Sequence, residues 1–265
     1  MAKIVWDQVG SRLYEAGLDR GVLYLADRSG VPWNGLRSVI EGVSGRVLTP
    51  VYHDGVKFTD TQILGEFAGS MTAITYPDEF LEYEGAAEFD DGVLFKNQPL
   101  KRFHLSYRTL SGTDLAALGA NYSIHILYNL LAVPRDLTSQ TLTDKTNPVE
   151  FGWTLSGVPE IISGFNPISH VIIESSDIDP DLLEDLENLL YGSENQEAQL
   201  PTLAELIDYL TNWVGITITD NGDGTWTATG SDQFIHIVSA TEFEITEANA
   251  TYLDADTYEV STGKE

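Results

Sequence analysis

The sequence contains no cysteine among its 265 residues. A disulfide framework and a thiolate metal site are therefore excluded. Basic residues are also scarce, with 14 Lys and Arg against 41 Asp and Glu and a formal net charge of −27. Binding to nucleic-acid phosphates or to an anionic membrane surface needs clustered Lys and Arg, so we expect neither a general nucleic-acid binder nor a membrane partner.

Long apolar runs are missing too. Nowhere do 18 consecutive apolar residues occur, and residues 1–12 have no apolar segment ahead of their charges. The sequence therefore predicts neither a transmembrane helix nor a secretory signal. Hydrophobic residues nevertheless make up 42% of the chain, which is enough to bury a core. We expect a soluble, acidic, globular protein made in a cytoplasm.

The negative charge is concentrated in the second half of the chain. Residues 1–145 hold 13 of the 14 basic and 18 of the 41 acidic residues, for a net charge of −5, whereas residues 146–265 carry −22. Such a surface either keeps the protein soluble or prevents it from adhering to a passing polyanion. The composition leaves both interpretations open.

Strand patterns dominate what is present. Residues 103–109 place Phe103, Leu105 and Tyr107 on one face, and His104, Ser106 and Arg108 on the other. Residues 122–130 alternate as well, with one face made by Tyr122, Ile124, Ile126, Tyr128 and Leu130. Shorter strands are predicted at 21–27, 67–76, 151–155 and 170–175. Period-two alternation is typical of half-buried strands, and strands at this spacing favour a β-sandwich or barrel.

Two helices interrupt the strands. Asp179 is a predicted N-cap with Pro180 at the first helical position, and Gly192 ends the helix predicted at 180–191. A second helix begins at the capping box formed by Thr202 and Glu205.

Strands return after the second helix. DNGDG at 220–224 lies between ITIT and TWTATG and predicts a hairpin. We expect a first domain at 1–200 and a helix with a C-terminal β-module at 201–265, unless that module completes the main fold. Polar, glycine-rich stretches at about 42–66, 77–100 and 133–150 are interpreted as long loops that contact other chains.

Motifs for chemistry are absent. None of the five histidines has a second histidine at i+2 or i+4, so packed or solvent-side strand histidines are expected and no metal site is predicted. DNGDG has Gly222 and Gly224 at positions 3 and 5, where a calcium loop needs ligands. No phosphate-binding loop, dinucleotide fingerprint or G-x-S-x-G appears. We therefore expect no cofactor and no enzymatic activity.

Several strings together resemble a known family. The strings are VPWNGL at 31–36, YHDGVKF at 52–58, TYPDEF at 75–80, ISHVIIESSDI at 168–178, LLYGSE at 189–194, DNGDGTW at 220–226 and YLDADTY at 252–258. With TYPDEF as the most specific part, they resemble the major tail proteins, or tail tube subunits, of long-tailed, siphovirus-type bacteriophages, especially those of actinobacteria.

The resemblance implies a structural role in the virion tail. It implies a β-sandwich with a flanking helix, six copies of which join sheet edges into a ring lined by a continuous β-barrel. Rings stack around a tape measure protein, between a tail terminator and distal tail or baseplate proteins, and DNA passes through the lumen at ejection. The family brings no catalytic residues, cofactor or metal.

Candidate assembly contacts follow from aromatic residues that lie beside Pro and Gly in loops. They are Trp33, Asn34, Tyr76, Pro77, Asp78 and Phe80. The alternative for each is a structural turn that packs on its own subunit. Two other functions stay open: a carbohydrate-binding β-sandwich that uses Trp33, Tyr52, Tyr76 or Trp226, and a hydrolase that uses one of the many carboxylate pairs.

Overall fold

The computed structural model describes residues 5–10, 12–63, 65–141, 148–194 and 196–212, together with six short strands beyond residue 216. The chain divides into two compact units, residues 1–176 and 177–265. Both predicted helices lie in the second unit, and the domain boundary predicted at residue 200 stays a prediction. No helix of the described residues is long and apolar enough to cross a membrane.

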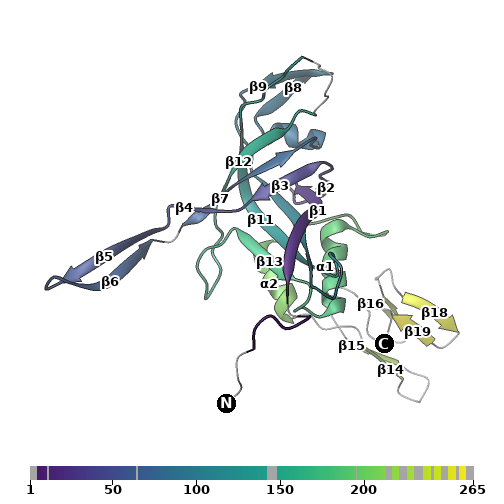
Figure 1. Ribbon diagram of the computed structural model, residues 1–265. Helices are drawn as coiled ribbons and strands as arrows, with labels where there is room; N and C mark the ends of the chain where they lie inside the picture. Colours follow the sequence, from purple (N-terminus) through teal and green to yellow (C-terminus); the bar gives the residue numbers. More distant parts are fainter. Residues whose placement is uncertain are drawn as a thin grey trace. The chain divides into compact units, whose positions relative to one another are not determined.

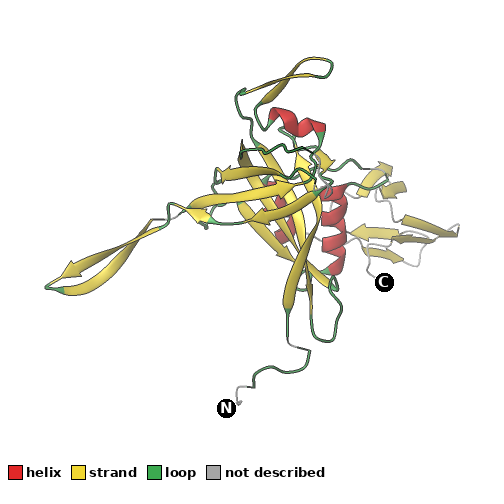
Figure 2. Cartoon of the chain, turned by 45° about the horizontal axis from the view of Figure 1, so that its top comes forward, coloured by secondary structure: helices red, strands yellow, loops and turns green. Residues whose placement is uncertain are grey.

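One sheet organises the first unit (Figures 1 and 2). Its strands are β1 (Tyr14–Tyr24), β2 (Gly30–Pro32), β3 (Leu36–Ile40), β4 (Val43–Ser44), β7 (Glu66–Ala73), β10 (Phe103–Gly112), β11 (Asn121–Pro134), β12 (Phe151–Gly157) and β13 (His170–Glu174). The order is β2-β1-β10-β11-β12-β7-β3, with β13 on β11 and β4 on β7. Every pairing is antiparallel, and the described sheet is open. The mainly-β, sandwich-like prediction is therefore confirmed, and a closed barrel is not formed.

A bulge changes the predicted face of one residue. β11 gains one residue on β10 between the pairs Phe103↔Leu130 and Leu105↔Leu127, and Asn129 takes a positive φ of 53° there. An extra residue reverses the alternation. Leu130 therefore joins the core cluster of Leu127 and Phe103 instead of the face predicted from the period.

Strand β10 is buried on both faces, although its sequence predicted one buried and one solvent-facing side. His104, Ser106 and Arg108 are 5%, 0% and 8% exposed. Each polar group has a partner, which makes its burial tolerable. Arg108 donates two hydrogen bonds, of 2.9 and 2.8 Å, to the Asp19 carboxylate. The backbone N–H of Asn129 donates to Nδ1 of His104 at 3.2 Å.

An aromatic cluster forms the centre of the core. Trp33, Phe80 and Trp153 are 3%, 0% and 1% exposed, and Tyr76 packs against them. The ring centroids of Phe80 lie 4.6 Å from Trp33 and 5.2 Å from Trp153. Phe80 belongs to the short 3-10 helix η1 (Asp78–Glu82), so the TYPDEF segment is an internal anchor of the fold.

Two of the three stretches predicted as long loops are β-hairpins. β5 (Val47–His53) pairs with β6 (Val56–Ile63), and β8 (Ala86–Asp90) pairs with β9 (Val93–Lys96). The first turn is Asp54-Gly55, and both residues have positive φ, 50° and 77°. That turn type suits the twist of a two-residue hairpin, which explains why the chain folds back there.

The second unit confirms the predicted helix ends. In α1 (Pro180–Tyr191), the Asp179 carboxylate accepts a hydrogen bond from the backbone N–H of Asp181 at 3.1 Å. In α2 (Leu203–Asn212), the backbone N–H of Thr202 donates to the Glu205 carboxylate at 2.7 Å, and the N–H of Glu205 donates back to the Thr202 hydroxyl at 3.1 Å.

The C-terminal β-module consists of short antiparallel pairs. The paired strands are β14 (Thr217–Asp220) with β15 (Trp226–Thr229), β16 (Ile235–Ser239) with β17 (Glu242–Ile245), and β18 (Ala250–Asp254) with β19 (Thr257–Val260). The hairpin strands predicted around DNGDG are thus confirmed, whereas residues 221–225 of its turn lie outside the described residues.

Candidate functional site

Three side chains from distant parts of the sequence converge in the first unit. Glu41 directly follows β3, His125 lies in β11 and His170 begins β13. In the β11–β13 register, His125 is opposite Ile172, and His170 is opposite Leu127. The two histidines are therefore diagonal neighbours on one face of the sheet, where long side chains can reach each other.

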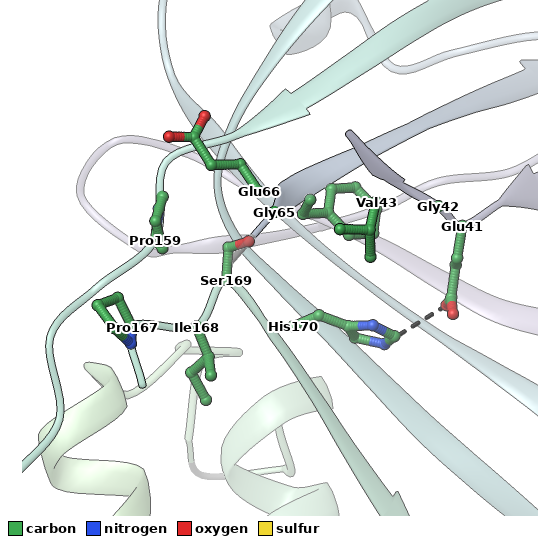
Figure 3. Close-up of a pocket in the computed structure, with 11 residues that line it drawn as sticks. Glu41, Gly42, Val43, Gly65, Glu66, Pro159, Pro167, Ile168, Ser169 and His170 are labelled. Carbon is green, nitrogen blue, oxygen red and sulfur yellow. Dashed lines mark ion pairs between the residues drawn. The ribbon is translucent and has the colours of Figure 1, made fainter. Parts of the chain in front are cut away.

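One potential ligand atom of each residue lies close to those of the other two. Oε1 of Glu41 lies 2.9 Å from Nδ1 of His125 and 3.4 Å from Nε2 of His170. The two ring nitrogens lie 3.3 Å apart. Figure 3 shows the Glu41 carboxylate pointing at the His170 ring. We call these three residues the Glu41–His125–His170 cluster; it could hold a metal ion.

Neighbouring strands support the cluster. The Tyr107 hydroxyl donates a hydrogen bond to Oε1 of Glu41, and the Thr109 hydroxyl lies 3.0 Å from Nε2 of His125. The Tyr107 and His125 rings are stacked, with centroids 4.8 Å apart and planes 8° apart. Since Tyr107 and His125 are opposite each other in the β10–β11 register, this stack is set by strand pairing.

The surroundings favour an ionised Glu41 carboxylate and a neutral His170 imidazole. Burial alone would raise the pKa of Glu41, but hydrogen bonds from His125 and Tyr107 and the nearby imidazoles together lower that pKa. Burial lowers the pKa of His170, and His125 adds to this effect, while the Glu41 charge opposes it. Burial also raises the pKa of the Tyr107 hydroxyl, so it stays a hydrogen-bond donor.

A pocket of about 380 Å³ gives access to the cluster. Its lining includes Phe67. Figure 3 shows Glu41, Val43, Glu66, Ser169 and His170 around the same pocket. His125 itself is 7% exposed and does not belong to the lining of the pocket. Two of the three residues of the cluster, Glu41 and His170, therefore line a pocket that is large enough for a small solute.

Spacing along the chain does not predict this arrangement. His125 and His170 are 45 residues apart, and neither spacing rule for metal-binding histidines applies to them. The prediction of packed strand histidines holds for His104, whose pKa burial lowers to about 4, with the Arg28 charge acting in the same direction. His53 is exposed beside Asp54, at 3.4 Å. His236 has a side chain outside the described residues.

The six predicted assembly contacts divide by exposure. Trp33 and Phe80 lie inside the core, and Nε1 of Trp33 donates a hydrogen bond to the carbonyl of Thr75 at 3.1 Å. For both residues, burial favours the alternative of a structural turn. Tyr76 and Pro77 are half-buried, whereas Asn34 and Asp78 are exposed. An assembly role of these residues stays a prediction.

The β5–β6 hairpin is a long exposed element of the first unit. Every residue of both strands is exposed, and Figures 1 and 2 show the hairpin extending away from the sheet. Its exposed apolar side chains include Leu48 (61%), Tyr52 (63%), Val56 (69%) and Phe58 (75%). The β8–β9 hairpin resembles it, with Phe89 and Phe95 stacked on each other at 4.8 Å and still 69% and 50% exposed.

Comparison with known proteins found similarity in structure alone. No family model and no curated protein matches the chain. A chain from the PVC sheath–tube complex, an extracellular contractile injection system in the extended state, is 15% identical with a TM-score of 0.31, covering 58% of this chain and 88% of that chain. The tube-terminating cap of the anti-feeding prophage is 12% identical with a TM-score of 0.30, covering 65% and 95%.

A third solved chain, from the PVC sheath/tube terminator in the extended state, is 14% identical with a TM-score of 0.28 and covers 65% of this chain and 99% of that chain. Similarities of this size assign neither a fold nor a function to the protein.

Proposed function

We propose that this protein is a non-enzymatic structural subunit of a phage-type tail tube, which assembles with copies of itself into stacked six-membered rings. The observation that carries the proposal is the β5–β6 hairpin with its uncovered apolar side chains. The family resemblance of the sequence supports it independently. The chain would then belong to the virion tail after synthesis in the host cytoplasm.

The hairpin needs a surface to cover it. A two-stranded hairpin on its own is marginally stable in water, because it buries too little apolar area to offset the entropy of ordering its residues. Phe58, Val56 and Tyr52 are all more than 60% exposed on this element. Exposed apolar side chains gathered on one projecting element are typical of a surface that another protein covers. A neighbouring copy is the partner that the family resemblance implies.

Open sheet edges supply a second kind of contact. Among the described residues, β13 has β11 as its strand partner, and the first half of β1 is paired with β10 alone. An unpaired edge offers backbone N–H and C=O groups to another strand. Edge pairing between copies that closes after a fixed rotation gives a ring, and a separate contact between rings gives a tube.

The charge fits a conduit for DNA. A chain with a net charge of −27 repels phosphate, so DNA would slide past an acidic lumen and not adhere to it. The same charge keeps free subunits soluble before assembly. A tape measure protein inside the tube, a tail terminator and distal tail or baseplate proteins are the further partners of this proposal, and none of them requires a cofactor.

The carbohydrate-binding alternative has less support. Of the aromatic side chains that could stack on a sugar, Trp33 is buried, and Tyr76 packs into the aromatic cluster. Tyr52 is exposed on the hairpin, and the side chain of Trp226 lies outside the described residues. We therefore do not propose this function.

Negative-stain electron microscopy of the purified chain at several concentrations tests the proposal. We expect six-fold rings or hollow tubes of uniform diameter. Phe58→Asp should abolish them, because it places a charge where an apolar side chain is to be covered. Phe165→Asp is the matched control, since Phe165 is 76% exposed and Phe58 is 75% exposed.

Two outcomes would contradict the proposal. The first is a wild-type protein that stays monomeric at every concentration, both alone and with preformed tail tips as initiators. The second is assembly that survives Phe58→Asp and Phe58→Lys alike, which would separate the hairpin from the contact.

A further inference from the structure

We propose that the Glu41–His125–His170 cluster is a binding site for a divalent transition-metal ion, with zinc as the best match. The inference concerns the fold of this chain and holds whether or not the chain forms a tube. It rests on the positions of three ligand atoms, on the groups that orient them, and on the pocket that leads to them.

The ligand atoms are spaced for coordination. Zinc binds imidazole nitrogen and carboxylate oxygen at about 2.0–2.2 Å in tetrahedral geometry, so its ligand atoms lie about 3.3 Å from one another. The three separations in the cluster are 2.9, 3.3 and 3.4 Å, and they join the same three atoms. One tetrahedral face is therefore already in place. The pocket adjoins the cluster, because Glu41 and His170 line it, and it has room for a fourth ligand such as water.

With Glu41 ionised, no placement of protons on the two ring nitrogens makes all three contacts of this triangle attractive. If both ring nitrogens carry a proton and donate to Glu41, the two N–H groups confront each other at 3.3 Å. If His170 Nε2 is deprotonated, its lone pair faces the carboxylate oxygen at 3.4 Å. Each arrangement leaves one contact between like groups, either N–H against N–H or lone pair against lone pair. A cation at the centre makes all three contacts attractive, because each lone pair then becomes a ligand.

The outer groups match those of metal sites. A ligating histidine usually donates its second ring N–H to a nearby oxygen, which sets the tautomer and the ring orientation. The Thr109 hydroxyl lies 3.0 Å from Nε2 of His125, which leaves Nδ1 free to ligate. Ligating carboxylates are also hydrogen-bonded, and Tyr107 donates to Oε1 of Glu41. The stacked Tyr107 ring further restrains His125.

The donor set selects the class of ion. Two imidazoles with one carboxylate suit zinc and its neighbours among the first-row transition metals. Magnesium and calcium prefer oxygen ligands throughout, so they should compete poorly. Bound metal would tie the end of β3 to β11 and β13, next to Gly42 and Val43, from which the chain continues into the β5–β6 hairpin.

Isothermal titration of the full chain with zinc chloride, after removal of metals by a chelator, tests the site. Excess magnesium in the buffer occupies the weak cation sites of an acidic surface. We expect one saturable equivalent of zinc per chain. His170→Gln and Glu41→Gln should abolish it, and both replaced side chains are accessible enough for the variants to fold. His53→Gln is the control, because His53 lies beside a single carboxylate and outside the cluster.

A second measurement keeps the result independent of heat signals. Cobalt(II) bound in a tetrahedral nitrogen and oxygen site absorbs visible light. We expect this absorption in the wild type and in His53→Gln, but not in His170→Gln or Glu41→Gln. Thr109→Val should weaken zinc binding by about 10- to 100-fold while leaving the stoichiometry at one, as expected for a group that orients a ligand. Wild-type protein without a saturable equivalent, or equal binding in His170→Gln and Glu41→Gln, would overturn the proposal.

Discussion

Mild acid should destabilise this protein through one buried histidine, His104. Its side chain is 5% exposed, and its Nδ1 accepts a hydrogen bond from the backbone N–H of Asn129. Burial, together with the Arg28 charge, lowers the pKa of His104 from 6.5 to about 4. The imidazole is therefore neutral in the folded chain at pH values where it is protonated in the unfolded chain.

The sign and the size follow from proton linkage. Between pH 6.5 and about 4, the unfolded chain binds a proton that the folded chain does not, so the free energy of unfolding falls as the pH decreases through this window. Above pH 6.5, His104 is neutral in both states and no longer makes the free energy of unfolding depend on pH. With these two pKa values, about 2 kcal/mol of stability should be lost between roughly pH 7.5 and roughly pH 5.

Urea unfolding measures this loss through the fluorescence of Trp33 and Trp153, which are both buried in the core of the same unit. His104→Asn is the variant to compare, because its amide oxygen can still accept from the Asn129 N–H but does not titrate. The contributions of other titrating groups to the free energy of unfolding cancel in the difference between wild type and variant. The reasoning is refuted if both proteins lose the same stability over this pH range.

Two further predictions concern packing and helix capping. Phe80→Ala should lower the free energy of unfolding in urea by about 3–5 kcal/mol, because it leaves a cavity among the rings of Trp33 and Trp153. Phe80→Leu should lower it clearly less, and equal losses for the two variants would contradict the packing argument. Thr202→Ala should destabilise α2 by about 1 kcal/mol, seen as faster amide exchange in its first turn, while Thr202→Ser retains the hydroxyl and should behave like wild type.

Local features of the fold could be predicted from the sequence. Both ends of α1 and the start of α2 were predicted correctly, because a cap is formed by residues within four positions of each other, as in Thr202 and Glu205. The C-terminal strands were correct because alternation and turn residues are also local signals. The Asp54-Gly55 pair carried the same kind of signal for the β5–β6 hairpin. The surrounding stretch is polar and glycine-rich, and this composition favours a loop.

Errors arose where a local pattern met long-range packing. The alternation of 122–130 was real, but the bulge at Asn129 moved Leu130 to the opposite face. The period alone does not show where an extra residue enters a strand. Likewise, the polar side of β10 contains Arg108, which is tolerated inside because Asp19 of β1 pairs with it.

The sequence by itself determined the mainly β composition, the two helices with their caps, and an acidic chain without thiol chemistry. Only the tertiary structure decided that the TYPDEF segment anchors the core, that the Val47–Ile63 stretch extends as a hairpin, and that Glu41, His125 and His170 meet. The reason is physical. Caps depend on neighbouring residues, whereas a cluster formed by two strands and the residue after a third depends on pairing registers and on how the sheet brings distant strands together.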